Sequence, residues 1–137
     1  MKEQENEKNI INALKAKESL LAGKGATQDQ IDFAENELGL TFASDYRSYL
    51  SSYGIVAFDG HELTGISKSE RLNVVSATLA ARKDYANIAS DLYVVENTGY
   101  EGIIILQNSK GEIFGCGINT KLEKLCDSLA DYVNGNY

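Results

Sequence analysis

The chain has 137 residues, 43% of them hydrophobic, and a net charge of −7. This composition excludes an intrinsically disordered chain, and the length suits one domain over residues 1–137. No apolar run approaches the ~18 residues of a membrane span, and the polar N-terminus lacks a signal sequence, so we expect a cytoplasmic protein away from membranes. Direct nucleic-acid binding is disfavoured because phosphate recognition requires a basic patch.

The acidic charge is concentrated in one part of the chain. Residues 25–65 hold seven acidic side chains against Arg47 alone, whereas residues 66–90 carry a net charge of +2. An acidic surface favours a basic partner and accelerates the encounter with it. The alternative interpretation is that the acidity only supports solubility.

Two helices are predicted in the first 40 residues. Amphipathic spacing indicates the first over about residues 5–21, before a break at residues 23–25. The second begins at a capping box, in which Thr27 caps the helix and Gln30 reaches back to the cap. Gly39 occupies the place of a left-handed residue that ends this helix.

A third helix is predicted between Ser44, an N-cap candidate, and Gly54. Tyr46, Tyr49 and Tyr53 share one face of this helix. Their helical spacing favours packing in the core over a role in binding.

The middle of the chain is predicted to form strands, and its end a helix. A turn at Asp59-Gly60 separates the first two strands, and Ser76 is expected to cap a helix that runs to about residue 85. The expected strands cover residues 55–58, 61–66, 72–75, 92–96, 103–106 and 112–117. The expected last helix starts at Asn119 or Thr120 and carries an apolar stripe of Leu122, Leu125, Cys126, Leu129, Tyr132 and Val133. This order predicts an α+β fold with a mainly antiparallel central sheet and helices from both chain ends packed around it.

Catalytic and metal-binding motifs are not found in the sequence. His61 is the only histidine, and Cys116 and Cys126 lie outside any CxxC motif, so we expect two buried, reduced thiols. Neither a GxSxG nucleophile motif nor a GxxxxGK phosphate loop occurs. We therefore expect no catalytic residue, no metal and no cofactor, and the chain is not expected to be an enzyme.

Tyr100 and His61 each stand out by themselves as candidates for contact with a partner. Tyr100 lies between Gly99 and Glu101 in a predicted loop, where no periodicity requires its burial. Tyrosine is enriched at binding hot spots, although its ring can instead fold over the sheet. His61 has three interpretations: local hydrogen bonding beside a turn, contact in a binding surface, or a catalytic or ligand role.

Four segments follow one another in a specific order along the chain. They are the glycine-ended helix pair of residues 25–54, the small-residue turn and E-L-x-G strand of 58–66, the V-V-E-N strand and acidic glycine loop of 94–102, and the hairpin of 108–113. This order, over about residues 20–133, resembles the SUKH superfamily, the Smi/Knr-type domain. The chain departs from it by lacking a proline before the third helix, where Ala43 stands.

The resemblance implies a protein-binding function. Bacterial members resemble immunity proteins that bind and neutralise polymorphic toxins, often nucleases, and a basic nuclease domain would suit this acidic chain. Fungal members resemble regulatory or scaffolding modules of cell-wall signalling, which is the alternative. The predicted contact surface combines two loops that the fold should bring near one sheet edge, and it comprises Asp59, His61, Glu62, Tyr100 and Glu101.

Overall fold

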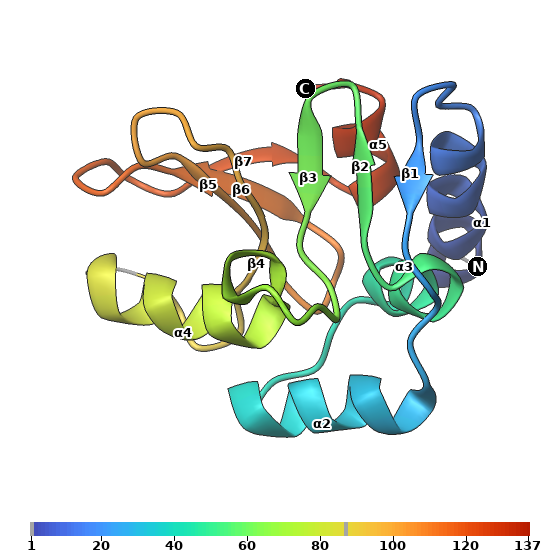
Figure 1. The fold of residues 1–137 in the computed structure, drawn as a ribbon. Coiled ribbons are helices and arrows are strands. Elements are labelled where there is room, and N and C mark those ends of the chain that lie inside the picture. The colour runs from blue at the N-terminus through green and yellow to red at the C-terminus, as the bar shows by residue number, and fades with distance from the viewer. Residues whose placement is uncertain (1, 87) are drawn as a thin grey trace.

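A computed structural model describes residues 2–86 and 88–137 of the chain. It contains a three-stranded sheet in the order β1-β2-β3 and a four-stranded sheet in the order β4-β5-β6-β7, and all neighbouring strands are antiparallel. Figure 1 shows α1, α3 and α5 beside the smaller sheet, α4 beside the larger one, and α2 below both. The predicted α+β class and antiparallel sheet are confirmed.

The first helix is shorter than predicted. α1 (Lys2–Lys15) buries Ile10 and Leu14, and the chain then turns into β1 (Leu21–Ala22). Leu21 pairs with Ala57 in β2, so its side chain does not continue the helical stripe. This long-range pairing ends the helix earlier than the local spacing indicates.

The second and third helices lie where the sequence predicts them. α2 (Gln28–Leu38) has both hydrogen bonds of the capping box at Thr27, and Gly39 ends it with a φ of 67°. α3 (Ser44–Tyr53) differs at its start, because Ala43 is the N-cap and no side chain caps the helix. The prediction of Ser44 as N-cap is therefore wrong.

The hairpin that follows has the predicted turn. β2 (Val56–Phe58) and β3 (His61–Leu63) flank Asp59-Gly60. Beyond β3 the chain passes close to the end of α3, where a Cβ atom on Gly65 would lie 1.8 Å from the carbonyl oxygen of Gly54. Only glycine allows the two backbones to approach this closely.

The segment leading into α4 is helical instead of extended. A 3-10 helix, η1 (Glu70–Leu72), precedes α4 (Val74–Asp84). The Asn73 side chain caps α4 by accepting hydrogen bonds from the backbone N–H groups of Val75 and Ser76. The predicted strand over residues 72–75 and the predicted cap at Ser76 are therefore wrong, because an Asn side chain satisfies the first free amides.

The last part of the chain corrects the predicted C-terminal helix. Its elements are β4 (Tyr93–Asn97), β5 (Ile104–Gln107), β6 (Ile113–Cys116), β7 (Glu123–Cys126) and α5 (Leu129–Val133). The residues from Leu122 to Cys126 do not form a helix, because this segment pairs with β6. α5 starts only after Ser128, whose hydroxyl caps it. The buried Asp45 carboxylate on α3 also accepts a hydrogen bond from the Leu129 amide at 2.9 Å.

Helices cover the four-stranded sheet on both faces. On one face, Val94, Ile104 and Leu106 pack with Ala81 of α4. The other face belongs to the larger core cluster, which includes residues of α1, α2, α3 and α5. Tyr46 and Tyr49 are fully buried there, as predicted from their spacing, while Tyr53 is half-buried.

The two sheets meet at Thr64. Its backbone N–H donates to the Val95 carbonyl at 2.9 Å, and its hydroxyl donates to the Val94 carbonyl at 2.7 Å. The Tyr49 hydroxyl donates to the Thr64 carbonyl at 2.7 Å. This junction fixes the β2–β3 hairpin beside β4.

Candidate functional site

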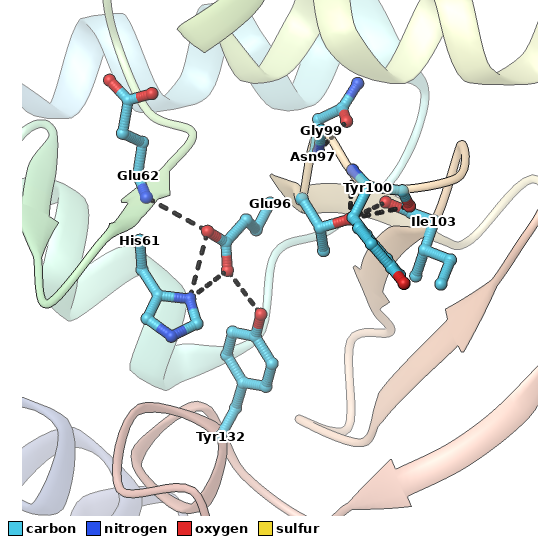
Figure 2. Close-up of polar contacts among 9 residues, drawn as sticks. His61, Glu62, Glu96, Asn97, Gly99, Tyr100, Ile103 and Tyr132 are labelled. Carbon is cyan, nitrogen blue, oxygen red and sulfur yellow. Dashed lines mark hydrogen bonds and ion pairs between the residues drawn. The ribbon is translucent and has the colours of Figure 1, made fainter.

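The tip of the β2–β3 hairpin is attached to β4 through one buried carboxylate. Glu96, only 3% exposed, accepts a hydrogen bond from the Glu62 backbone N–H at 3.1 Å. Its other oxygen lies 3.0 Å from Nδ1 of His61 and also accepts from the Tyr132 hydroxyl of α5. Figure 2 shows these three partners converging on Glu96. The carboxylate thus joins three elements that are distant in the sequence.

The contact with Glu96 determines how His61 faces the solvent. An ionised carboxylate only accepts hydrogen bonds, so Nδ1 of His61 carries the proton. The other ring nitrogen, Nε2, takes part in none of the hydrogen bonds among the described residues, and the His61 side chain is 42% exposed. The ring stacks on Phe58 at a centroid distance of 5.3 Å. His61 is therefore held by a long-range hydrogen-bond partner as well as by stacking on Phe58 across its own turn.

The two hairpin carboxylates of the predicted surface are exposed but paired. Asp59 accepts a hydrogen bond from the Ser19 hydroxyl at 2.7 Å and lies 3.5 Å from Nζ of Lys17. The Ser19 hydrogen bond, followed by the Lys17 charge, lowers the pKa of Asp59. Glu62 forms an ion pair with Arg71 at 2.8 Å, and this hydrogen-bonded guanidinium lowers its pKa.

Tyr100 and Glu101 lie in the loop between β4 and β5. The Tyr100 side chain is 66% exposed, so the ring does not fold over the sheet. Glu101 has a φ of 51°, an uncommon conformation for a residue with a side chain. The Thr98 hydroxyl fixes the loop by donating to the Ile103 carbonyl at 2.8 Å and accepting from the Tyr100 amide.

The structure places the two parts of the predicted surface on either side of the end of β4. In Figure 2, Tyr100 lies apart from the cluster around Glu96. Among the described residues, no hydrogen bond or ion pair joins Tyr100 or Glu101 to the hairpin. Glu96, the next-to-last residue of β4, is bonded to the hairpin, and the loop that carries Tyr100 and Glu101 begins directly after this strand.

Sequence reasoning missed the structural function of Glu96 and Tyr132. The available signal was a carboxylate inside an otherwise apolar strand, since a buried charge requires hydrogen-bond donors. Tyr132 was assigned to an apolar stripe, and only its hydroxyl group indicated a polar partner. Neither signal identifies a partner 35 or 36 residues away.

The titratable groups elsewhere give little support for catalysis. Both cysteines are free; Cys126 is buried as predicted, whereas Cys116 is half-buried. Burial raises the pKa of both thiols, that of Cys126 to about 11, which makes them poor nucleophiles. Within residues 2–86 and 88–137, no three His, Cys, Asp or Glu side chains gather to hold a metal ion. None of the helices described is sufficiently long and apolar to span a bilayer.

Comparisons with known proteins identify the family. No curated protein matches the chain. A crystal structure of a protein from Pseudomonas syringae pv. tomato is similar, with a TM-score of 0.73 and 14% identity over 93% of this chain and 95% of that chain. At this identity the likeness shows the fold alone. The family model SUKH_5, described as SMI1-KNR4 cell-wall, matches residues 7–135. The chain therefore belongs to the SUKH (SMI1-KNR4) family.

Proposed function

We propose that this chain is a cytoplasmic immunity protein that binds and neutralises a cognate polymorphic toxin, a basic nuclease domain, without catalysing a reaction. Membership of the SUKH family supports a protein-binding function. The observation that carries the proposal is the fixed polar hairpin tip, where the buried Glu96 holds His61 and Glu62 in place. Asp59 lies on the same tip, and Tyr100 and Glu101 extend the surface beyond β4.

A fixed tip favours tight binding. Ordering of loops and side chains opposes association, and a surface already held in its bound geometry avoids much of that cost. Here the Glu62 backbone and the His61 ring are both bound to a side chain that is itself buried. An immunity protein needs slow dissociation, and most affinity differences between related complexes arise in the dissociation rate.

The existing ion pairs leave the carboxylates available to a basic partner. The Asp59 and Glu62 side chains are 54% and 46% exposed, and pairs this exposed contribute little to stability. An arginine or lysine of a toxin can replace Lys17 or Arg71 without leaving a buried charge. Tyr100 supplies a large exposed ring in the loop beyond β4, and such rings are typical anchors of interfaces.

The test is co-expression with the toxic domain encoded by the adjacent gene, read as growth rescue and co-purification. Replacing Asp59, Glu62 and Glu101 together by alanine should abolish rescue and weaken binding by at least about tenfold. The control replaces Glu3, Glu5 and Glu7 of α1 by alanine, which changes the net charge equally on another surface. Full protection by the first variant would show that the toxin binds elsewhere.

The description of the family as cell-wall favours a second candidate, a regulatory or scaffolding module for other proteins. An immunity gene should lie beside a large toxin gene, whereas a scaffolding protein has no such requirement. Failure of every neighbouring toxic domain to bind the chain, together with altered cell-wall sensitivity after deletion of its gene, would support this candidate instead.

A further inference from the structure

An apolar groove lies far from the hairpin tip. It runs between α2 and the segment that leads into α4, and its volume is about 520 Å³. In Figure 1, α2 is at the bottom of the molecule and the β2–β3 turn at the top. Phe33, Ala34, Ile66 and Val75 line the groove, which we call the α2 groove. The Phe33 side chain is 63% exposed, although it is one of the largest apolar groups of the chain.

Negative charge surrounds Phe33. Asp29 and Glu37 lie four residues before and after it, so both carboxylates share its side of the helix, one turn away in each direction. Neither takes part in an ion pair in the part of the chain that the structure describes. Residues 28–38 contain no lysine or arginine. Across the groove, Glu70 adds a further negative charge and Lys68 one positive charge.

We propose that the α2 groove binds a basic segment of another protein, which inserts an apolar side chain against Phe33 and places lysine or arginine beside Asp29 and Glu37. An exposed aromatic ring in an apolar groove is typical of an interface anchor. The flanking carboxylates select positively charged neighbours of that side chain and accelerate the encounter. The inference goes beyond the immunity function, because it uses other residues and needs no toxin.

Charge argues against other occupants. Two copies of this chain that met through their α2 grooves would bring the acidic faces of both helices together, and like charges at an interface oppose association. Nucleic acid and anionic membranes are repelled for the same reason. A basic protein segment satisfies both the apolar and the acidic parts of the surface.

The probe for the test is the peptide Lys-Lys-Leu-Leu-Lys-Lys, titrated into the 15N-labelled full chain and followed by NMR. We expect saturable shifts concentrated in residues 28–38 and 66–76, which become weaker at higher salt. Phe33→Ala should weaken binding about tenfold, and the charge-removing pair Asp29→Asn and Glu37→Gln should also weaken it. Leu21→Ala, which removes a large exposed apolar side chain outside the groove, should leave the affinity unchanged.

Three outcomes would overturn the proposal. They are shifts centred on the hairpin or absent altogether, equal affinity of the Phe33→Ala protein, and equal binding of a peptide with glutamate in place of lysine. Self-association in sedimentation that Phe33→Ala abolishes would instead identify a second copy as the occupant. Because the titration contains no toxin, its failure leaves the immunity proposal intact. Conversely, loss of toxin rescue in the Asp59, Glu62 and Glu101 variant does not affect the groove.

Discussion

Replacing Glu96 by alanine tests whether this carboxylate holds the hairpin tip. The substitution removes the acceptor of the Glu62 amide, the Tyr132 hydroxyl and Nδ1 of His61. The half-exposed His61 ring can bind water instead, so the loss of its hydrogen bond to Glu96 costs little. Tyr132 is 5% exposed, and its hydroxyl loses its acceptor in a place with poor access to solvent.

The expected destabilisation follows from these partners. A buried donor left without an acceptor costs about 1–3 kcal/mol, and the partly buried Glu62 amide belongs at the lower end of that range. Removal of a desolvated carboxylate offsets part of the cost. We expect the free energy of unfolding to fall by about 2–3 kcal/mol, a large share of the about 5–15 kcal/mol typical of a domain.

Glu96→Gln is the matched control. The glutamine oxygen can accept from the Glu62 amide, while its NH2 group donates to the Tyr132 hydroxyl oxygen and to Nδ1 of His61. This arrangement requires the His61 proton to move to Nε2. The Glu62 amide, Nδ1 of His61 and the Tyr132 oxygen are then all bonded, and only the Tyr132 O–H loses its acceptor, so the free energy of unfolding should fall by about 1 kcal/mol, less than in the alanine variant.

Urea unfolding measures the two stabilities, and the 15N chemical shifts of the His61 ring report which nitrogen carries the proton. Wild type should show the proton on Nδ1 and the Gln variant on Nε2. Equal stability of wild type and the Ala variant, or equal losses in both variants, would refute the inferred hydrogen bonds.

Three further predictions concern other parts of the fold. Gly65→Ala should lower the free energy of unfolding by about 3 kcal/mol or more, since its Cβ would collide with a backbone carbonyl. Gly39→Ala, at a positive φ in open space, should lower it by about 1 kcal/mol in the same urea assay. Equal losses of stability in the two variants would contradict this prediction. Burial raises the pKa of Asp45 above its ordinary 3.8, so its contribution to stability is complete below pH 3.8 and is lost as the pH rises through the raised value. Asp45→Asn should therefore reduce the fall of the free energy of unfolding with pH between pH 3.8 and the raised pKa. An unchanged dependence on pH in the variant would show that Asp45 does not cause this fall. In the folded protein a thiol reagent should modify the half-buried Cys116 before the buried Cys126, which gives a fast and a slow phase of labelling. Cys116→Ser should abolish the fast phase. Fast labelling that survives the substitution would show that Cys126 is the more reactive thiol.

Local signals predicted the elements that depend on nearby residues. The capping box of Thr27 and Gln30 and the left-handed Gly39 act within one turn of helix, and both predictions are confirmed. The wrong predictions of secondary structure arise where strands pair with distant parts of the chain. Leu125 and Cys126 have helical spacing with later residues, yet hydrogen bonds to β6 place them in a strand. A single sequence contains no direct record of such pairings.

The candidate site shows the same division. Tyr100 was expected to have no reason for burial, and its ring is exposed. The partners of Asp59 and Glu62, by contrast, were not predicted. Two helices separate Lys17 from Asp59 in the sequence, and Arg71 lies just before the segment that was expected to be extended. Whether these residues contact a toxin stays a prediction.

The junction at Thr64 has a consequence for how new specificity can arise. Its amide, hydroxyl and carbonyl are all used within the protein, bonded to β4 and to the buried tyrosines of α3. The outward side chains of Asp59 and Tyr100 contribute nothing to that junction. Evolution, or a designed library, can therefore exchange the exposed residues of both loops to recognise a different target while the architecture beneath them is preserved.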